Sequence, residues 1–273
     1  MPQPPDVDAL HLVAVAAGRD TYTDPKTGYD VFTALSHERR GSCCGCGCRH
    51  CPFGLEAVST GRAAARDPYL IGPSPTQAVD VLFWSGGKDS YLALRAMQAE
   101  ALRPVVLFTT FDARSRIVAH QQVPIEAIVE QAEQLDLALV LVPLGGGSDY
   151  GERVRLGLGL LRRRVPIVRI ASGDLHLHSI RAWRETHLGP LADQVGAELA
   201  FPLWNVPYAQ LEADLSASGA TCRITAFDAD KLELELGEIF NERMRAELPA
   251  GVDAFGEQGE FHTLVQLASP HPS

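Results

Sequence analysis

The stretch Val81-Leu82-Phe83-Trp84-Ser85-Gly86-Gly87-Lys88-Asp89-Ser90 decides the fold of this chain, because an apolar run leads into a glycine turn and then into a helix-forming segment. Gly86 and Gly87 allow a tight turn and a close approach of backbone to a ligand. The first N–H groups of the helix are unpaired and lie at the positive end of its dipole, so they attract anions. Lys88 adds a positive charge, and the two serines add hydroxyl donors. The stretch predicts a phosphate-binding loop.

This loop differs from the Walker A motif, in which the lysine is followed by serine or threonine. Here Lys88 is followed by Asp89, and no glycine stands five residues before Gly87. A purely structural interpretation is a strand-to-helix turn in which Ser85 caps the helix. The hexapeptide 85–90 resembles instead the PP-loop of the ATP pyrophosphatases, which cleave ATP between the α- and β-phosphates. The resemblance implies that this loop binds ATP.

Apolar runs alternate with helix-forming stretches from residue 79 onward, and the run Val105–Phe108 is continuous, as in a parallel strand that is covered on both faces. This alternation predicts an α/β fold with a doubly wound, mainly parallel, Rossmann-like sheet. Expected strands are 80–84, 105–111, 138–143 and 166–171; expected helices are 89–100, 124–135 and 150–163.

Ligands of such sheets bind at the carboxyl ends of the strands. Thr109 follows the apolar run Val105–Phe108, where it either contacts an adenosine or has a structural role. Gly173 and Asp174 follow the fourth expected strand, where a carboxylate beside a phosphate site could hold Mg²⁺ or a ribose hydroxyl.

Length and charge limit the classes of function. The chain has 273 residues and a net charge of −10, with 24 basic against 34 acidic residues. This balance argues against a general nucleic-acid binder, which usually carries a basic excess. No apolar run is long enough to span a bilayer, and the N-terminus lacks the features of a secretory signal. We therefore expect a cytoplasmic protein with no membrane partner.

Five of the six cysteines cluster near the front of the chain, at Cys43, Cys44, Cys46, Cys48 and Cys51. Adjacent cysteines pair poorly as disulfides, and dense cysteines in a cytoplasmic protein indicate metal or redox chemistry. The gap between Cys48 and Cys51 lets both thiolates reach one ion, and Cys43 and Cys46 offer a second such pair. Zn²⁺ is the first expectation and an iron–sulfur cluster the second. Reactive thiols without a metal are the remaining interpretation.

The composition divides the chain into a cysteine-rich, metal-binding module at 11–60, a proline-containing linker at 61–78 and a main domain at 79–268. Within the module, the apolar run Leu12–Ala16 predicts a short strand and the stretch Asp24–Gly28 a turn. The module resembles a small cysteine-rich domain family of unknown function, which brings no activity with it.

Three further segments extend the resemblance of the main domain. They are Gly173-Asp174, Pro202-Leu203-Trp204 and the glycine- and glutamate-rich sequence from Gly256 to Thr263. Alternating glycines and carboxylates make a poor core strand and suit either an exposed site loop or an acidic surface turn. Together with the loop at 85–90, these segments resemble the diphthine–ammonia ligase family of PP-loop enzymes over nearly all of residues 80–266.

This resemblance implies that ATP adenylates a carboxylate and that ammonia then displaces AMP to give an amide. It implies four ligands: ATP, Mg²⁺, ammonia and an acceptor that carries a carboxylate. A modified protein side chain is one candidate for this acceptor. The implied catalytic residues are Lys88 and Asp89. The implied nucleotide- and Mg²⁺-binding residues are Ser85, Gly86, Gly87, Lys88, Asp89, Ser90, Thr109, Gly173 and Asp174. The implied acceptor-binding residues are Glu257, Gly259, Glu260 and His262, with Trp183 or Trp204 as a face for a quaternary ammonium.

Two other functions remain open from the sequence. A PP-loop enzyme that thiolates tRNA would use a cluster bound by the cysteines for sulfur transfer, although the acidic balance speaks against tRNA binding. A regulator that binds ATP and a metal without turnover would keep the loop and the cysteines but release no AMP and pyrophosphate.

Overall fold

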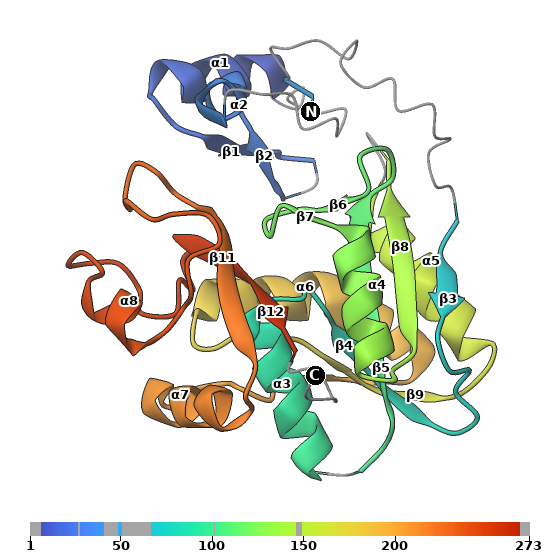
Figure 1. The fold of residues 1–273 in the computed structure, drawn as a ribbon. Coiled ribbons are helices and arrows are strands. Elements are labelled where there is room, and N and C mark those ends of the chain that lie inside the picture. The colour runs from blue at the N-terminus through green and yellow to red at the C-terminus, as the bar shows by residue number, and fades with distance from the viewer. Residues whose placement is uncertain are drawn as a thin grey trace.

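The computed structural model describes residues 7–26, 28–40, 49–50, 67–100, 102–145 and 149–267. Figure 1 shows a central sheet flanked by helices, with the N-terminal elements lying over the end toward which the strands of the sheet point. The five clustered cysteines lie outside the described residues.

The central sheet has six strands in the order β10-β9-β4-β5-β8-β3. All neighbours are parallel except β3, which pairs antiparallel with β8. The predicted mainly parallel α/β sheet is thereby confirmed. The strands are β3 (Tyr69–Ile71), β4 (Val79–Phe83), β5 (Val105–Asp112), β8 (Leu139–Leu144), β9 (Ile167–Ala171) and β10 (Glu198–Ala200).

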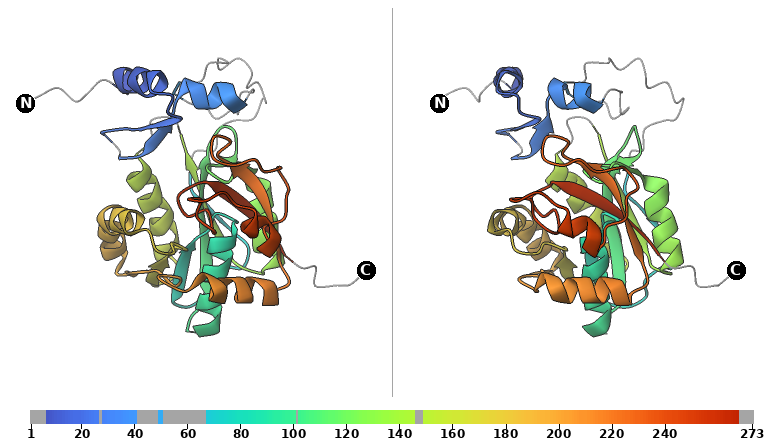
Figure 2. Two further views of the ribbon diagram at one scale, coloured as in Figure 1. Left: turned by 90° about the vertical axis from the view of Figure 1, so that its left-hand side faces the viewer. Right: turned by 60° about the vertical axis from the view of Figure 1, so that its left-hand side comes forward.

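Helices cover both faces of this sheet (Figure 2). Val79 and Val81 of β4 pack into one buried cluster with residues of α5 and α6, whereas Leu82 packs into the other with residues of α3 and α4. Burial on both faces explains why the strands read as continuous apolar runs. The helices are α3 (Lys88–Glu100), α4 (Ile125–Gln134), α5 (Tyr150–Arg162), α6 (His178–Val195), α7 (Tyr208–Ala217) and α8 (Glu242–Ala246). Across the described ranges, no helix has the length and hydropathy to cross a bilayer.

Two antiparallel two-stranded sheets stand beside the central sheet. One is the short hairpin of β6 (Ile117–Val118) and β7 (Val123–Pro124) after β5. The other pairs β11 (Thr221–Phe227) with β12 (Phe261–Gln266), with a break in register between Ile224 and Ala226, and the segment between these strands contains α8. β12 contacts α3, so the C-terminal pair of strands closes one side of the predicted phosphate loop.

The N-terminal segment differs from its predicted structure. It forms α1 (Val7–Ala16), β1 (Thr21–Thr23), β2 (Asp30–Phe32) and α2 (Ala34–Arg40). The strand predicted at Leu12–Ala16 is wrong, because these residues belong to α1. Leu12 and Val13 are exposed while Ala14 is fully buried, which is the pattern of a short helix packed on one face.

The main sheet also begins earlier than the boundary predicted at residue 79. Tyr69–Ile71 forms β3 and pairs with β8 through Tyr69–Leu141, so part of the proline-containing segment adds an edge strand. The sequence does not reveal this strand for two reasons. It is only three residues long between proline-containing segments, and its partner β8 lies far along the chain.

Candidate functional site

The predicted phosphate loop lies at the point where the order of the sheet reverses. From β4 the chain proceeds outward through β5 and β8, and it then returns to place β9 on the other side of β4. The loop 84–87 follows β4 and the segment 172–177 follows β9, so the two lie at the same edge of the sheet. Ligands of doubly wound sheets bind at this switch point.

Gly86 has no room for a side chain. Its φ is +80°, and a Cβ at this position would lie 2.5 Å from Ile128 Cδ1 and 2.7 Å from Gln131 Oε1. Its carbonyl accepts hydrogen bonds from Val265 N at 2.9 Å and from Gln131 Nε2 at 3.0 Å. Both the backbone conformation and the close packing therefore require glycine here.

Gln131 of α4 is a buried amide that the sequence did not point to. Its Nε2 donates to Gly86 O and to Val265 O at 2.7 Å, and its Oε1 accepts from Trp84 Nε1 at 2.9 Å. The side chain thus joins β4, the loop and β12. A glutamine in an amphipathic helix gives no local signal of such a role, because all its partners are distant in sequence.

The serines of the loop hold its shape. Gly87 N donates to Ser85 Oγ at 3.3 Å, and Ser90 Oγ donates to Gly87 O at 2.9 Å. The two hydroxyl oxygens are 3.4 Å apart. Gly87 precedes α3, so the Ser85 hydroxyl braces the turn and does not form the helix cap that the structural interpretation expected.

Lys88 begins α3 and is almost fully buried, with 2% exposure. Its backbone N–H donates to Thr263 Oγ1 at 3.1 Å, and its Nζ donates to Asp89 Oδ2 at 3.0 Å. The ammonium also lies 5.3–5.5 Å from the ring centroids of Phe240, Phe255 and Phe261. Ring faces and a carboxylate are the partners that offset the cost of burying an ammonium group.

Asp89 carries a carboxylate oxygen without a partner. Oδ1 is buried and has no hydrogen-bond partner among the described residues, although the side chain as a whole is 37% exposed. Burial raises the pKa of the Asp89 carboxyl; Lys88 opposes this shift, and the nearby Asp174 and Asp253 add to it. An unpaired buried carboxylate oxygen in an acidic setting fits a bound divalent cation.

The segment after β9 packs directly against the phosphate loop. A Cβ on Gly173 would lie 2.6 Å from Asp89 O and 3.1 Å from Ser90 N. Glycine at this position therefore lets the segment after β9 pack against the first turn of α3. The Asp174 carboxylate accepts from Ser172 Oγ at 2.6 Å and from Arg184 Nε at 3.2 Å. The structure thus brings Gly173 and Asp174 to the loop, as predicted.

Thr109 lies within β5, where it has a structural role. Its hydroxyl donates to Trp84 O at 2.7 Å, and the side chain is 1% exposed. This hydroxyl joins β5 to the chain that leads into the loop. The structural interpretation of Thr109 is therefore the one that its hydrogen bond supports.

The two glutamates of the C-terminal motif have different environments. Glu260 is 2% exposed, and its carboxylate accepts from Asp253 N and Gln258 N, both at 3.0 Å, so it shapes its own loop. Glu257 instead accepts from Leu175 N at 2.9 Å and thereby connects this loop to the segment after β9. Burial raises the pKa of Glu257. Gly259 has a φ of +83° and open space around it.

A tyrosine, an aspartate and a histidine form a further polar cluster at this edge. Tyr208 Oη donates to the Asp253 carboxylate at 2.8 and 2.9 Å, and it lies 3.1 Å from His176 Nδ1. Burial and the Asp253 carboxylate raise the pKa of Tyr208 above its usual range. Asp253 precedes the glycine-rich motif by three residues, which was the one sequence signal for this cluster.

His262 lies on β12 next to Thr263, and its ring centroid is 5.9 Å from that of His120 in the turn between β6 and β7. Burial, the neighbouring His120 and the charge of Lys88 lower the pKa of His262 to about 3. Because the next residue, Thr263, accepts from Lys88 N, the structure places His262 beside the phosphate loop.

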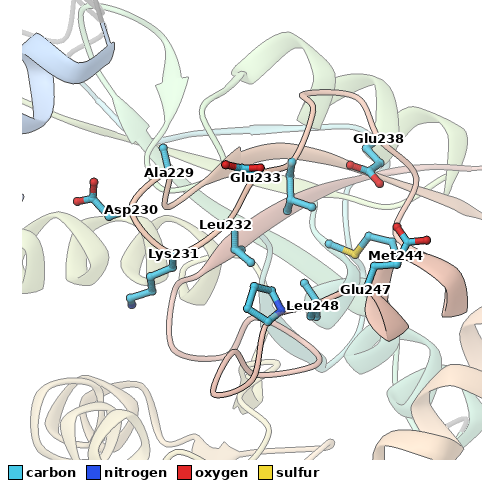
Figure 3. A pocket seen from close by; sticks show the side chains of 11 residues that line it. Ala229, Asp230, Lys231, Leu232, Glu233, Glu238, Met244, Glu247 and Leu248 are labelled. Carbon is cyan, nitrogen blue, oxygen red and sulfur yellow. The ribbon is translucent and has the colours of Figure 1, made fainter.

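A separate hollow of about 490 Å³ opens between the segment 229–238 and α8 (Figure 3). Asp230, Glu233, Glu238 and Glu247 line it together with Lys231 and apolar side chains. No residue of the loop 85–90 lines this hollow. It is therefore distinct from the edge of the sheet at which the predicted site residues meet.

Comparison with known proteins gives a family match to the front of the chain. Residues 10–57 match a family of unknown function (DUF5522). Among solved structures, the chain is similar to the crystal structure of a predicted subunit of tRNA methyltransferase from Methanocaldococcus jannaschii. That match has a TM-score of 0.38 and 16% sequence identity, and it covers 70% of this chain and 97% of that chain. A likeness of this size assigns no function to this chain.

Proposed function

We propose that the chain is an ATP-dependent, AMP-forming ligase that joins ammonia to a carboxylate acceptor. The observation that carries this proposal is the glycine loop at the switch point of the sheet. There α3 begins with Lys88 and Asp89, and Asp89 Oδ1 is buried with no hydrogen-bond partner among the described residues. Backbone donors, a buried ammonium and a carboxylate at one point suit a Mg²⁺-bound polyphosphate.

The first step is transfer of the adenylyl group. A carboxylate oxygen of the acceptor attacks the α-phosphorus, the bond from that phosphorus to the αβ-bridging oxygen breaks, and pyrophosphate leaves. Charge grows on the leaving oxygens, where the Lys88 ammonium and the N–H groups of the loop stabilise it. In the structure, Gly87 N donates to Ser85 Oγ and Lys88 N donates to Thr263 Oγ1. Binding of phosphate would replace these hydroxyl acceptors with anionic oxygens, which form stronger hydrogen bonds.

The second step forms the amide. Ammonia attacks the acyl carbon of the mixed anhydride, the bond from that carbon to the phosphate oxygen breaks, and AMP leaves with this oxygen. We assign the carboxylates at this edge, Glu257 and Asp253, to the binding of a cationic acceptor. An ionised carboxylate can take the proton that the nitrogen loses once neutral ammonia has added to the acyl carbon.

Mg²⁺ fits Asp89 better than Asp174 as a direct ligand. Asp89 Oδ1 lacks a partner, whereas Asp174 is held by Ser172 and Arg184. A divalent cation supplies charge neutralisation on the phosphates when bound. Asp174, already held by Ser172 and Arg184, would hold such an ion through water and not directly.

The test is to incubate the protein with ATP, Mg²⁺, ¹⁵N-ammonia and a panel of carboxylates that includes peptides with a quaternary ammonium, and to identify products by mass spectrometry. We expect AMP, pyrophosphate and a ¹⁵N-amide. Lys88→Met keeps the buried volume among the phenylalanines but removes the charge, so AMP release should fall on the order of 100-fold. Lys231→Met, at an exposed lysine, is the matched control.

Other products would contradict the proposal. ADP with inorganic phosphate would place bond cleavage at the wrong phosphorus. Nucleotide binding without AMP for any acceptor would favour a regulator, and sulfur incorporation into tRNA would favour a thiolation enzyme.

We also propose that the clustered cysteines hold Zn²⁺. His50, which lies between two of them in sequence, is anchored in the N-terminal segment by a contact of 2.8 Å between its Nε2 and Tyr22 Oη and by stacking on His11 at 3.8 Å. The anchoring of His50, together with the spacing of the cysteines in the sequence, is what supports a metal site over free thiols. Elemental analysis should find close to one zinc per chain; an iron–sulfur absorption band or a metal-free folded protein would contradict this.

A further inference from the structure

Two histidines from different elements meet beside the phosphate loop. His120 lies in the turn of the β6–β7 hairpin and His262 on β12, and their ring centroids are 5.9 Å apart. The next residue after His262 is Thr263, which accepts from Lys88 N. Next to His120, Gln121 Nε2 lies 3.5 Å from the position that a Cβ on Gly87 would take. The hairpin turn and β12 therefore both border the loop.

The turn that carries His120 has an unusual backbone. His120 and Gln122 have φ values of 62° and 54°, in the left-handed region that few non-glycine residues adopt. Hydrogen bonds from Gln122 N to Val118 O at 3.0 Å and from Gln121 N to Ala119 O at 2.7 Å hold this shape. Backbone strain of this kind concentrates where a side chain is held for binding.

The cations already present at this edge are each neutralised. Lys88 Nζ pairs with Asp89 at 3.0 Å, and Arg184 pairs with Asp174 at 3.2 Å. A nucleoside triphosphate carries about four negative charges. Inside a cleft, a positively charged donor stabilises these charges more than water does. Histidine is the side chain that gains positive charge near neutral pH.

We propose that His120 and His262 bind the two terminal phosphates of the nucleotide, and that His120 takes up a proton from solvent as this anion binds. This inference rests on the proposed function, because the bound group is the pyrophosphate that leaves in the adenylyl transfer. His262 acts as a neutral N–H donor, and His120 becomes the imidazolium that offsets charge on the leaving group.

The surroundings decide which ring takes the proton. His262 faces His120 and Lys88, and its pKa of about 3 keeps it neutral. The charged groups facing His120 are Arg184 of α6, which with burial lowers its pKa, and Asp30 of β2, which raises it. Because the Asp30 carboxylate offsets positive charge at His120, whereas the groups that act on His262 are His120 and Lys88, His120 is the member that protonates next to an anion.

The sign of the pH dependence follows. The bound polyphosphate raises the pKa of His120, so affinity is highest below the pKa that His120 has in the free protein and falls as pH rises from there through the raised pKa. AMP lacks the terminal phosphates and should bind with little dependence on either histidine.

The experiment is calorimetric titration of the full chain with α,β-methylene ATP and Mg²⁺ at pH 7, in two buffers that differ in heat of ionisation. The wild-type protein should take up a measurable fraction of one proton. His120→Asn, which keeps a residue type that tolerates positive φ, should abolish proton uptake and weaken binding about tenfold. His262→Gln should weaken binding about tenfold but keep the uptake, and both variants should bind AMP as the wild type does.

His178→Asn, at an exposed histidine of α6, is the matched control and should behave as the wild type. Unchanged proton uptake in His120→Asn, or equal weakening of AMP and the triphosphate analogue, would overturn the inference while the proposed function stands. Failure of the wild type to bind either nucleotide would overturn both. Falling affinity between pH 6 and pH 8 in the wild type gives an independent check if a variant does not fold.

Discussion

A buried carboxylate oxygen without a hydrogen bond is costly in a folded protein unless a ligand meets it, and Asp89 Oδ1 is such an oxygen within the described part of the chain. The raised pKa of Asp89 means that the folded protein keeps the proton to higher pH than the unfolded chain does. The ionised form therefore destabilises the fold at neutral pH, and this effect disappears below the unfolded pKa of about 4.

Asp89→Asn should consequently raise the thermal unfolding midpoint of the ligand-free protein at pH 7, with a difference that shrinks as pH falls toward 4. The same variant should lose Mg²⁺-dependent AMP release on the order of 100-fold, because stability and function conflict at such a site. Asp193→Asn, at an exposed position of α6, is the control. A variant that is less stable than the wild type at pH 7 would contradict the account.

The meeting of two elements at Gly173 gives a steric prediction. A methyl group at Gly173 would press on backbone atoms of Asp89 and Ser90, which cannot move aside without shifting α3. Gly173→Ala should therefore cost about 1–3 kcal/mol of unfolding free energy in urea and should also weaken nucleotide binding. Gly189→Ala, inside α6 with nothing within 4 Å, should be neutral or stabilising by up to about 1 kcal/mol. Equal effects of the two substitutions would contradict this packing.

The elements that the sequence predicts well are those whose signal is local. The strand at 105–111 and the turn and helix start at 85–90 are predicted correctly. Burial on two faces gives a continuous apolar run, and a tight turn requires glycine, so both signals lie within a few residues. The run Leu12–Ala16 does not, since five apolar residues fit a buried strand or one side of a short helix equally well.

The candidate site was only partly predictable for the same reason. The glycine turn at Gly86 and Gly87 predicts a close approach of backbone, and the structure has no room for a side chain at Gly86, whereas the tight contact at Gly173 had no such signal. Gln131 and Tyr208 act through partners more than 30 residues away, so no local pattern reveals them. The motif from Gly256 to Thr263 predicts that Glu260 binds the acceptor. In the structure its carboxylate is buried and accepts from two backbone N–H groups of its own loop.

Across the whole molecule, the N-terminal elements lie against the edge of the sheet that holds the candidate site (Figure 1). Tyr29 packs on Tyr150 and Trp183 with ring centroids 5.2 and 5.3 Å apart, respectively. At the other side, Arg39 forms ion pairs with Asp20 of its own segment and with Asp230 of the main domain. Exposed ion pairs contribute little, so the aromatic contact should carry most of the docking energy.

Tyr29→Ala should therefore loosen the N-terminal elements without unfolding the main sheet. Each aromatic pair contributes about 0.5–1.5 kcal/mol beyond the area it buries, so loss of both should speed amide exchange in β1 and β2 and at the start of α5 by roughly tenfold or more. Leu12→Ala, at an exposed residue of α1, should leave these rates unchanged. Because Phe32 of the same hairpin lies 6.5 Å from the His120 ring, Tyr29→Ala should also weaken the triphosphate analogue more than AMP. Unchanged exchange in Tyr29→Ala would show that other contacts hold the N-terminal elements in place.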